Sequence, residues 1–567
     1  MNLFDTLQTA TLESGETEAE RRAAAAQFAD RFTERSGALA PTHDLLPADE
    51  QRALDAVVAD LAARGTDLRG YQHAAVETAL SYRRVVLGFA PGLGKTLTVT
   101  TAWAAAKAAG ATGTLLVVCP PHLRPNWVGD AAKHHPGLSV TIVDGIKQAP
   151  VPTGSDIVVV PDSVIFARRD DLLAAITSGT VTALAFDEAH RFKSNRHGTK
   201  RSHAALLISN ALHQQDSEAL IFSLTGTLVA NYPADVIQPV ALCGPEVTKR
   251  LSASGGWDKE IGHTGYASFR SFWSEGEYKR LPDGTLVLDK VTGCKNPQQL
   301  NDELTAAAYL WVDRYEVTDL EPVTWVSQPA DCADTFGEHV YEIRSNFLTW
   351  IEAELGQAAR DRASRAEQLV QLDKLRKYEA LAKTEQTVSV VADLVAQAEQ
   401  VVVFAWHKEC VWALGGSLAK RGIRYVTITG DDTLKQKRQA QVEFQAGDVP
   451  VVICNISSAS TGIDLDSPTS RTVLFHQLPW TPSDLIQSAG RVERLTQTRS
   501  CVAIMPLATD GGEVSFEERL AAILTTKVAI ADAVNNGGQF DTLAQHVHAE
   551  ESVAGALMAT YGWADYE

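Results

Sequence analysis

Two blocks of short apolar runs, separated by helix-forming stretches, constrain the fold of this 567-residue chain more than any other feature. Runs such as "TLLVVCP" and "DIVVVP" recur between residues 71 and 245, and runs such as "QVVVFAW" and "VPVVICN" recur between residues 385 and 508. Apolar runs without polar alternation are typical of parallel strands that helices cover on both faces. The sequence therefore predicts an α/β protein with two parallel-sheet lobes.

The segments outside these blocks are rich in helix formers or in polar turns. The stretches "ETEAERRAAAAQFADRF" and "ADEQRALDAVVADLAARG" near the N-terminus predict helices, as do "NDELTAAAYLWV" and "RASRAEQLVQLDKLRKYEALA" in the middle. The expected domains are a helical N-terminal segment (1–67), a first lobe (68–245), a helical or irregular middle and linker (246–384), a second lobe (385–510) and a helical C-terminal tail (511–567).

The composition argues against several classes of protein. The first thirty residues carry acidic groups and no apolar run, and no eighteen consecutive residues are apolar, so we expect neither a signal peptide nor a membrane span. Seven cysteines are scattered singly without a C-x-x-C pair, which argues against structural zinc and disulfides and indicates a reducing cytoplasm. Abundant alanine and arginine, with little lysine and methionine, favour a GC-rich bacterial or phage genome.

The net charge of −19 weakens any broad electrostatic attraction between this protein and nucleic acid. It does not exclude a local basic track, because phosphate contacts depend on where lysines and arginines lie. The densest basic stretch is "HRFKSNRHGTKRSH" (190–203), which directly follows a candidate catalytic segment. Elsewhere in a chain such a stretch is more often a solvated surface.

The stretch "GFAPGLGKTLTV" (88–99) is similar to a phosphate-binding loop, G-x-x-x-x-G-K-[ST]. Gly94, Lys95 and Thr96 complete that pattern after Gly92, while Phe89 stands at the position of its first glycine. A strand-like run precedes the loop and a helical run follows it, which is the geometry that cradles phosphates. Lys95 would then reach the β- and γ-phosphates and Thr96 would offer a hydroxyl to Mg²⁺. The alternative is a tight turn between strand and helix.

The stretch "ALAFDEAHRFKS" places Asp187 and Glu188 at the end of an apolar strand. A carboxylate at a strand end can hold the metal, and its neighbour can polarise the attacking water. An Asp-Glu pair alone is common as a helix cap or a surface acid pair. After a phosphate loop, and followed by Ala189 and His190, it indicates a nucleotide hydrolase.

Together "GLGKT" and "DEAHRFKS" resemble the first two motifs of superfamily 2 helicase-type motors, in particular the DEAH-box-like motifs of Swi/Snf-type DNA translocases. That family usually lacks the loop's first glycine as well. Ala90 and Pro91 depart from the acidic residue and methionine that it usually carries there. The resemblance implies two RecA-like lobes of the P-loop NTPase class, ATP and Mg²⁺ as cofactors, and DNA as the partner.

Other motifs of the first lobe follow in the family's order. By resemblance, Gln72 of "LRGYQ" recognises adenine and Tyr71 packs on the base. The stretch "LLVVCPPHLRPNW" is similar to the segment that approaches the DNA strand. In "SLTGTLVANYPADV", Thr225 and Thr227 would link the nucleotide state to the grip on DNA, and His190 would couple the ATP site to the DNA motifs.

In the second lobe, "SSASTGIDL" resembles the family's glycine-rich motif, with Gly462 and Asp464 at the matching positions for nucleotide binding. Ala459 and Ser460 replace two glycines that usually precede it.

The most specific match is "PWTPSDLIQSAGRVERLTQT" (479–498), in which Gln487, Arg491 and Arg494 fit the arginine-finger motif. By resemblance, Gln487 lies at the nucleotide and the two guanidinium groups stabilise charge on the γ-phosphate in the transition state. Glu493 replaces the histidine that is common before the last arginine.

The resemblance covers residues 68 to 510, and within the family the chain is most similar to the annealing-helicase branch. The accessory recognition domains of that branch's long members are not evident. The stretch "LWVDRYEV" (310–317) lacks the paired arginines that often brace the two lobes there, so the sequence does not predict that brace.

The resemblance implies a DNA-stimulated ATPase of superfamily 2 that moves on double-stranded or forked DNA, in DNA repair or replication, with a possible protein loading partner. It would remodel forks, anneal strands or displace bound proteins. One alternative is a helicase that separates DNA or RNA strands with the same core. The other is a nucleotide-gated scaffold with little turnover, which the intact Lys95, Asp187, Glu188, Arg491 and Arg494 oppose.

Overall fold

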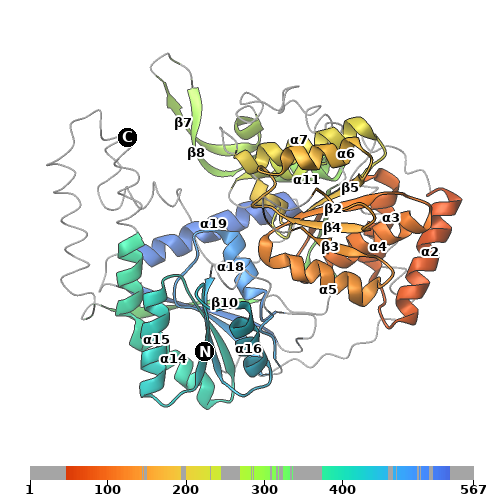
Figure 1. The fold of residues 1–567 in the computed structure, drawn as a ribbon. Helices are drawn as coiled ribbons and strands as arrows, with labels where there is room; N and C mark the ends of the chain where they lie inside the picture. The colour runs from red at the N-terminus through yellow and green to blue at the C-terminus, as the bar shows by residue number, and fades with distance from the viewer. Residues whose placement is uncertain are drawn as a thin grey trace.

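The computed structural model describes residues 46–143, 145, 150–192, 199–229, 232–243, 269–281, 284, 286–306, 309–314, 317, 323–332, 335, 373–456, 464–467, 469–493, 497, 500–509 and 515–536. Within these residues, two wholly parallel sheets form two lobes that lie beside each other (Figure 1). The predicted α/β fold with two parallel-sheet lobes is confirmed.

The sheet of the first lobe has the strand order β3-β4-β2-β5-β6-β1-β9. Its central strands are buried, which explains why their sequences show no polar alternation. The strands are β1 (Arg84–Phe89), β2 (Thr114–Cys119), β3 (Val140–Ile142), β4 (Ile157–Pro161), β5 (Val181–Phe186), β6 (Leu220–Leu224) and β9 (Tyr309–Val312).

Helices cover both faces of the first sheet (Figure 1). One face packs against α3 (Gly70–Tyr82), α4 (Lys95–Ala108) and α5 (Arg124–His134), with α2 (Ala48–Ala63) outside α4. The other face packs against α6 (Arg169–Thr177) and α7 (Lys200–Gln215). The shorter helical elements are η3 (Pro121–Leu123), η4 (Ala189–Phe192), η5 (Pro233–Val236) and α8 (Ile237–Ala241).

The sheet of the second lobe has the order β10-β15-β14-β11-β13-β12 and is also parallel throughout. Its strands are β10 (Thr324–Asp331), β11 (Gln400–Ala405), β12 (Tyr425–Ile428), β13 (Val451–Asn455), β14 (Ser470–Phe475) and β15 (Val502–Thr509). Helices α14 (Thr384–Ala396) and α15 (Lys408–Lys420) cover one face. Helices α16 (Leu434–Gln445), α18 (Pro482–Ala489) and α19 (Phe516–Asn536) cover the other.

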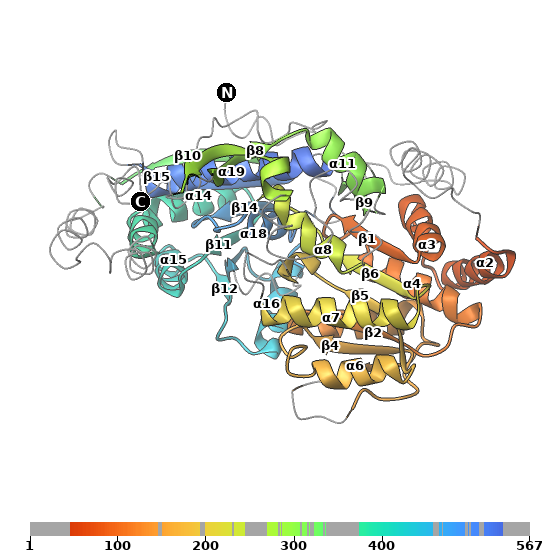
Figure 2. The same ribbon diagram turned by 90° about the horizontal axis from the view of Figure 1, so that it is seen from above.

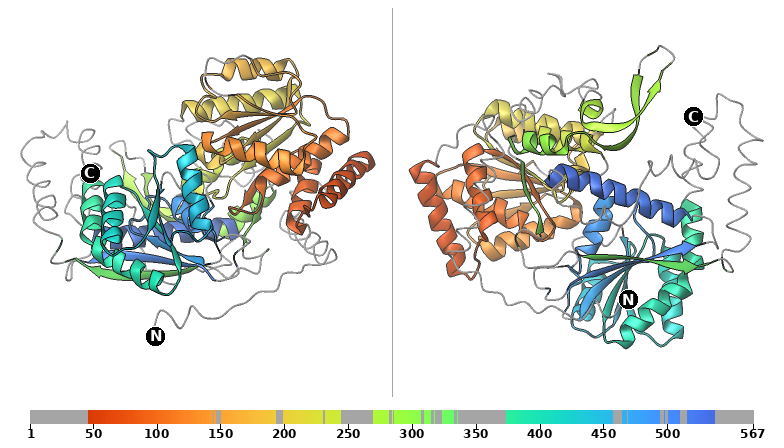
Figure 3. Two further views of the ribbon diagram at one scale, coloured as in Figure 1. Left: turned by 60° about the horizontal axis from the view of Figure 1, so that its bottom comes forward. Right: turned by 180° about the vertical axis from the view of Figure 1, so that it is seen from behind.

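The middle segment contains strands that the sequence did not predict. The stretch "NDELTAAAYLWV" was expected to be one helix, but only its first six residues are helical, as the end of α11 (Pro297–Ala306). The last four residues of the stretch form β9 beside β1. The helix prediction was wrong there because pairing with a buried strand overrides local helix propensity. Strand β10 extends the second sheet, and β7 (Ser274–Arg280) pairs with β8 (Leu286–Cys294) in a hairpin that stands away from the lobes (Figures 1 and 3).

The other expected helices are found where the structure describes the chain. Helix α2 confirms "ADEQRALDAVVADLAARG", whereas "ETEAERRAAAAQFADRF" lies outside the described residues. Of "RASRAEQLVQLDKLRKYEALA", residues 373–382 are helical and the earlier ones lie outside the described part. The predicted domain boundaries, such as those at 245 and 384, stay a proposal.

Helix α19 runs from one lobe to the other, beside α11 and β8 (Figures 2 and 3). Near its start, Phe516 and Leu520 pack in the core of the second lobe. Near its end, Ile530 and Val534 pack in a cluster of the first lobe with Tyr309. One element therefore contacts the cores of both lobes.

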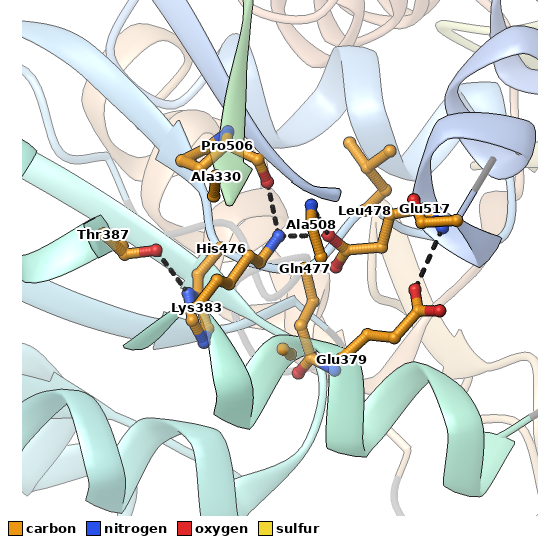
Figure 4. Close-up of polar contacts among 12 residues, drawn as sticks. Ala330, Glu379, Lys383, Thr387, His476, Gln477, Leu478, Pro506, Ala508 and Glu517 are labelled. Carbon is orange, nitrogen blue, oxygen red and sulfur yellow. Dashed lines mark hydrogen bonds and ion pairs between the residues drawn. The ribbon is translucent and has the colours of Figure 1, made fainter. Parts of the chain in front are cut away.

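Buried polar groups fasten the start of α19 to the second lobe (Figure 4). The Glu379 carboxylate accepts hydrogen bonds from the backbone N–H groups of Phe516 and Glu517, at 3.2 and 3.3 Å. The ammonium group of Lys383 donates to the Pro506 carbonyl and to the Glu517 carboxylate. Carboxylates stabilise helix N-termini and buried charges require partners, so this network fixes where α19 begins.

The far end of α19 is held by the first lobe. The amide nitrogen of Asn301 donates to the carbonyls of Val534 and Asn535, at 3.0 and 2.6 Å. The Tyr309 hydroxyl donates to the Asn535 side chain at 3.1 Å.

None of the helices in the described ranges is long and apolar enough to cross a bilayer.

Candidate active site

The phosphate loop joins β1 to α4 and needs glycine at two positions only. Gly92 and Gly94 have φ angles of +89° and +80°, a backbone conformation that residues other than glycine rarely adopt. Phe89, at the position of the absent first glycine, ends β1 with its ring buried edge-on against Tyr71, 5.4 Å between centroids. The loop therefore forms without a glycine at position 89, and Lys95 Nζ donates to the Phe89 carbonyl at 2.8 Å.

Tyr71 and Gln72 are buried at the start of α3 and hold this loop. The Tyr71 hydroxyl and the Gln72 Nε2 both donate to the Leu93 carbonyl, each at 3.0 Å. The Gln72 Oε1 accepts from the backbone N–H of Arg69 at 2.9 Å. These contacts fix the loop from one side, and adenine recognition by the two side chains stays a prediction.

Asp187 and Glu188 follow β5 at the carboxyl edge of the sheet. The Asp187 Oδ2 accepts from the buried indole N–H of Trp127 at 2.9 Å, and its Oδ1 accepts from the Glu188 backbone N–H at 2.9 Å. Glu188 has a φ of +51°, a strained left-handed conformation that turns the chain sharply after the strand.

Burial, together with the neighbouring charge of Glu188, raises the pKa of Asp187 to about 6. The hydrogen bond from Trp127 and the charge of Lys95 act in the opposite direction and favour the ionised carboxylate. Lys95 is thus close enough to Asp187 to stabilise its charge.

The donor set beside the loop suits Mg²⁺, which binds hard oxygen ligands. Thr96 offers a hydroxyl in the first turn of α4, and Asp187 offers a carboxylate whose two oxygens are held in place. Thr96 and Asp187 would hold the metal there, and its charge would offset the negative charge of the phosphates.

A chain of polar contacts leads from the acid pair into the second lobe. His190 Nδ1 lies 3.3 Å from Glu188 Oε2 and is hydrogen-bonded to Thr225 Oγ1 at 3.1 Å. The Thr225 hydroxyl donates to the Thr227 carbonyl at 2.9 Å and accepts from its N–H at 3.0 Å. The Thr227 hydroxyl then meets the Ser483 hydroxyl of α18, 3.0 Å away.

The path continues to Gln487, whose Nε2 donates to the Ser483 hydroxyl at 3.2 Å. The loop that carries Thr225 and Thr227 also lies on the phosphate loop, since a Cβ on Gly226 would lie 3.2 Å from Pro91 and 3.5 Å from Lys95 Nζ. The structure thus brings the three predicted coupling residues together with the acid pair and with Gln487.

Arg491 follows α18, and its charge faces the first lobe. Burial, together with the nearby charges of Arg191 and Arg491, lowers the pKa of His122 to about 4. The Arg491 carbonyl accepts from the Leu465 N–H at 2.9 Å, which ties it to the residue after Asp464. Gly462 and Arg494 lie outside the described residues.

A single arginine connects the lobes where the sequence predicted no brace. Arg314, just after β9, donates to the Glu493 carbonyl at 2.7 Å and to the Glu493 carboxylate. Its other terminal nitrogen donates to the Pro91 carbonyl in the phosphate loop. The stretch "LWVDRYEV" lacks the paired arginines from which such a brace could be predicted, but one guanidinium has enough donors to bind both lobes.

Sequence reasoning missed three residues of this site: Trp127, Ser483 and Arg314. Each of them contacts a partner that is far away in the sequence. Trp127 and Asp187 are 60 residues apart, and Ser483 and Thr227 are 256 residues apart. The tryptophan of "LLVVCPPHLRPNW" was part of a matching motif, but nothing in that motif indicates which carboxylate it contacts.

Comparison with known proteins adds independent findings. Residues 65–230 match the family model "Type III restriction enzyme, res subunit", and residues 382–496 match "Helicase conserved C-terminal domain". A Xenopus tropicalis protein, "SWI/SNF-related matrix-associated actin-dependent regulator of chromatin subfamily A-like protein 1", is 23% identical over 439 residues, which are 77% of this chain and 42% of that protein. These matches support a SWI2/SNF2-type, helicase-like protein of superfamily 2.

Other SWI2/SNF2-type proteins show similar partial matches. The mouse protein "Chromodomain-helicase-DNA-binding protein 1-like" is 22% identical over 510 residues, 86% of this chain and 52% of that protein. The "Sulfolobus solfataricus SWI2/SNF2 ATPase core in complex with dsDNA" is 16% identical with a TM-score of 0.35, covering 86% of this chain and 98% of that one.

The SWI2/SNF2 assignment confirms the family that the motifs indicated. The chain spans about two fifths of the length of the frog relative, 42%. These two curated relatives are eukaryotic, so they do not support the predicted bacterial or phage origin.

Proposed function

We propose that this chain hydrolyses ATP in a reaction that DNA stimulates, and that it moves along double-stranded or forked DNA. The observation that carries the proposal is the chain of polar contacts from Glu188 through His190, Thr225 and Thr227 to Ser483, hydrogen-bonded from His190 onward. This path joins the acid pair of the first lobe to the arginine motif of the second. The rate of ATP hydrolysis can therefore depend on the position of one lobe relative to the other.

The proposed roles follow from the chemistry of phosphoryl transfer. Lys95 would bind the β- and γ-phosphates, while Thr96 and Asp187 would hold Mg²⁺. Glu188 would polarise the attacking water, and Arg491 together with Arg494 would stabilise charge on the γ-phosphate. An arginine finger contributes on the order of 10³- to 10⁵-fold in rate, so closure of the lobes would control turnover.

A small basic cluster at the carboxyl edge of the first sheet supports a nucleic-acid track. Arg191 and Arg201 both donate to the buried carboxylate of Asp162, at 2.9 and 3.0 Å, with their side chains 38% and 34% exposed. Each guanidinium has donors beyond these bonds, and phosphate contacts require only such local charge. The name of the mouse relative includes both helicase and DNA-binding.

The first test is steady-state ATP hydrolysis without nucleic acid and with duplex DNA, forked DNA, single-stranded DNA or RNA. Glu188→Gln is the control, since it keeps the shape of the side chain and removes its charge. We expect stimulation by duplex or forked DNA that the control lacks. Stimulation mainly by single strands or RNA would favour the strand-separating helicase, and ATP binding without turnover on any track would favour the scaffold.

Strand annealing, fork remodelling and protein displacement are separate outcomes of one motor. The resemblance of the sequence motifs to the annealing-helicase branch leads us to propose annealing of complementary strands first. The test adds the protein and ATP to a partly unwound plasmid. Rewinding that needs ATP supports annealing, and ATP-dependent release of a strand from a fork would contradict it.

A further inference from the structure

Arg314 is the point where the arginine motif of the second lobe meets the phosphate loop of the first. The side chain comes from the first lobe, after β9. One terminal nitrogen donates to both the backbone carbonyl and the carboxylate of Glu493, and the other donates to the Pro91 carbonyl. Pro91 also lies under Gly226 of the coupling loop. One guanidinium therefore contacts both halves of the candidate site.

Burial makes this contact strongly dependent on the position of the lobes. Arg314 and Glu493 are each 5% exposed. A buried charge is costly unless it is paired and hydrogen-bonded. If the lobes move apart, each of the two charged side chains loses the partner that offsets its desolvation. The planar fork of arginine can hold two acceptors at a fixed angle, which an ammonium group cannot.

Gly490, just after α18, lies against the guanidinium. A Cβ built on Gly490 would lie 3.4 Å from Arg314 Nη2, an ordinary contact distance, and 3.3 Å from the Ile486 carbonyl. The turn after α18 therefore packs directly against Arg314. Arg491 is the next residue, so the contact fixes the backbone beside it.

Both partners of Arg314 lie in segments that the sequence analysis singled out. Glu493 belongs to the stretch "PWTPSDLIQSAGRVERLTQT", and Pro91 belongs to the phosphate loop "GFAPGLGKTLTV". A glutamate provides the negative charge that a buried guanidinium requires. Proline has no backbone N–H, but its carbonyl remains available as an acceptor.

We propose that Arg314 is a positioning residue, which holds the Gln487–Arg491 turn of the second lobe against the phosphate loop before nucleotide binds. Its effect on hydrolysis rests on the function proposed above, whereas its effect on the distance between the lobes does not. The ion pair brings Arg491 near its working position, so less rearrangement remains when ATP enters.

The first experiment measures the distance between the lobes in the full chain without nucleotide. Dyes attached through unnatural amino acids at Leu207 of α7 and Trp412 of α15, which are 51% and 66% exposed, report it by energy transfer. We expect Arg314→Gln and Glu493→Gln to lower the transfer efficiency or broaden its distribution. Arg314→Lys keeps the charge and loses the fork, so it should give an intermediate value.

The matched control is Glu385→Gln. Glu385 pairs with Arg421 within the second lobe at 3.2 Å, with both side chains partly exposed, so the same chemical change breaks an ion pair that does not join the lobes. Its transfer efficiency should equal that of the wild type. Circular dichroism at the measuring temperature shows that each variant is folded.

The second experiment measures ATP hydrolysis on saturating DNA. Arg314→Gln should lower kcat about tenfold or more, a part of the rate that placed arginines supply, while KM changes less than about threefold. Arg314→Lys should recover part of the loss. A loss of active protein would also lower the apparent kcat at unchanged KM, so kcat is expressed per nucleotide-binding site, counted by titration with a fluorescent nucleotide. A merely structural role would then leave kcat per binding site unchanged.

Each result decides a different statement. Unchanged energy transfer in folded Arg314→Gln and Glu493→Gln protein would overturn the inference. Lowered transfer with wild-type kcat would mean that Arg314 fastens the lobes but does not position Arg491, which also contradicts it. If the wild type hydrolyses no ATP, the proposed function fails, and energy transfer still decides the contact.

Discussion

Trp127→Phe tests whether the indole N–H sets the charge of Asp187. The change keeps an aromatic ring in the buried site and removes the donor that lies 2.9 Å from Asp187 Oδ2. A hydrogen bond to a charged group contributes about 1.5–3 kcal/mol, and each pKa unit corresponds to about 1.4 kcal/mol. Loss of this bond should therefore raise the pKa of Asp187, which is about 6 in the wild type, by about one to two units.

The pH dependence of this variant has a definite sign. Because Mg²⁺ requires the ionised carboxylate, its binding weakens as the pH falls through the pKa of Asp187. With that pKa raised, Trp127→Phe should need several-fold more Mg²⁺ than the wild type near pH 7, and about the same amount near pH 9. The readout is Mg²⁺-dependent binding of a fluorescent ADP, measured across this pH range.

Trp103→Phe is the matched control for this measurement. Trp103 is also a buried tryptophan of the first lobe, but its indole N–H donates to the Asp156 backbone carbonyl at 2.9 Å. It should leave the Mg²⁺ titration unchanged at every pH. The reasoning would be refuted if Trp127→Phe titrates like the wild type near pH 7, or if its defect is the same at pH 7 and pH 9.

Three further changes test other contacts. Lys383→Met leaves the Glu517 carboxylate buried without its cation, so urea unfolding should show a loss of about 3–5 kcal/mol, and a loss below about 1 kcal/mol would contradict the network around α19. Ser483→Ala removes the hydroxyl that meets Thr227, so DNA stimulation of ATP hydrolysis should fall several-fold while nucleotide binding, measured by fluorescence, stays unchanged; equal stimulation would exclude this path. Gly94→Ala forces a side chain at φ +80°, so nucleotide affinity should fall at least tenfold, and calorimetry showing wild-type affinity would disprove the need for glycine there.

The central strands of both sheets could be predicted because local sequence alone determines their signal. Each is a continuous apolar run that must be buried on both faces, as in "TLLVVCP" for β2. Two of the edge strands, β9 and β10, gave no such signal. β10 is half exposed and contains Pro329, and β9 directly follows a helical stretch, so their sheet positions depend on partners elsewhere in the chain.

The residues of the site could be predicted only where a motif defines them. The loop glycines and the acid pair have fixed spacing, so their positions followed from the sequence. Arg314 depends on Glu493, 179 residues away, and Trp127 on Asp187, 60 residues away. No short-range pattern encodes such pairs, because they form only when separate elements pack together.

Displacement of a third DNA strand from a duplex tests the central claim most directly, since it detects movement along double-stranded DNA rather than ATP turnover alone. The substrate carries a short triplex-forming strand at a distance from the loading end, and the reaction contains the full chain with ATP or a non-hydrolysable analogue. We predict release of the third strand that requires ATP hydrolysis and is lost in Glu188→Gln. Duplex-stimulated ATP hydrolysis without any release of that strand would contradict a translocating motor.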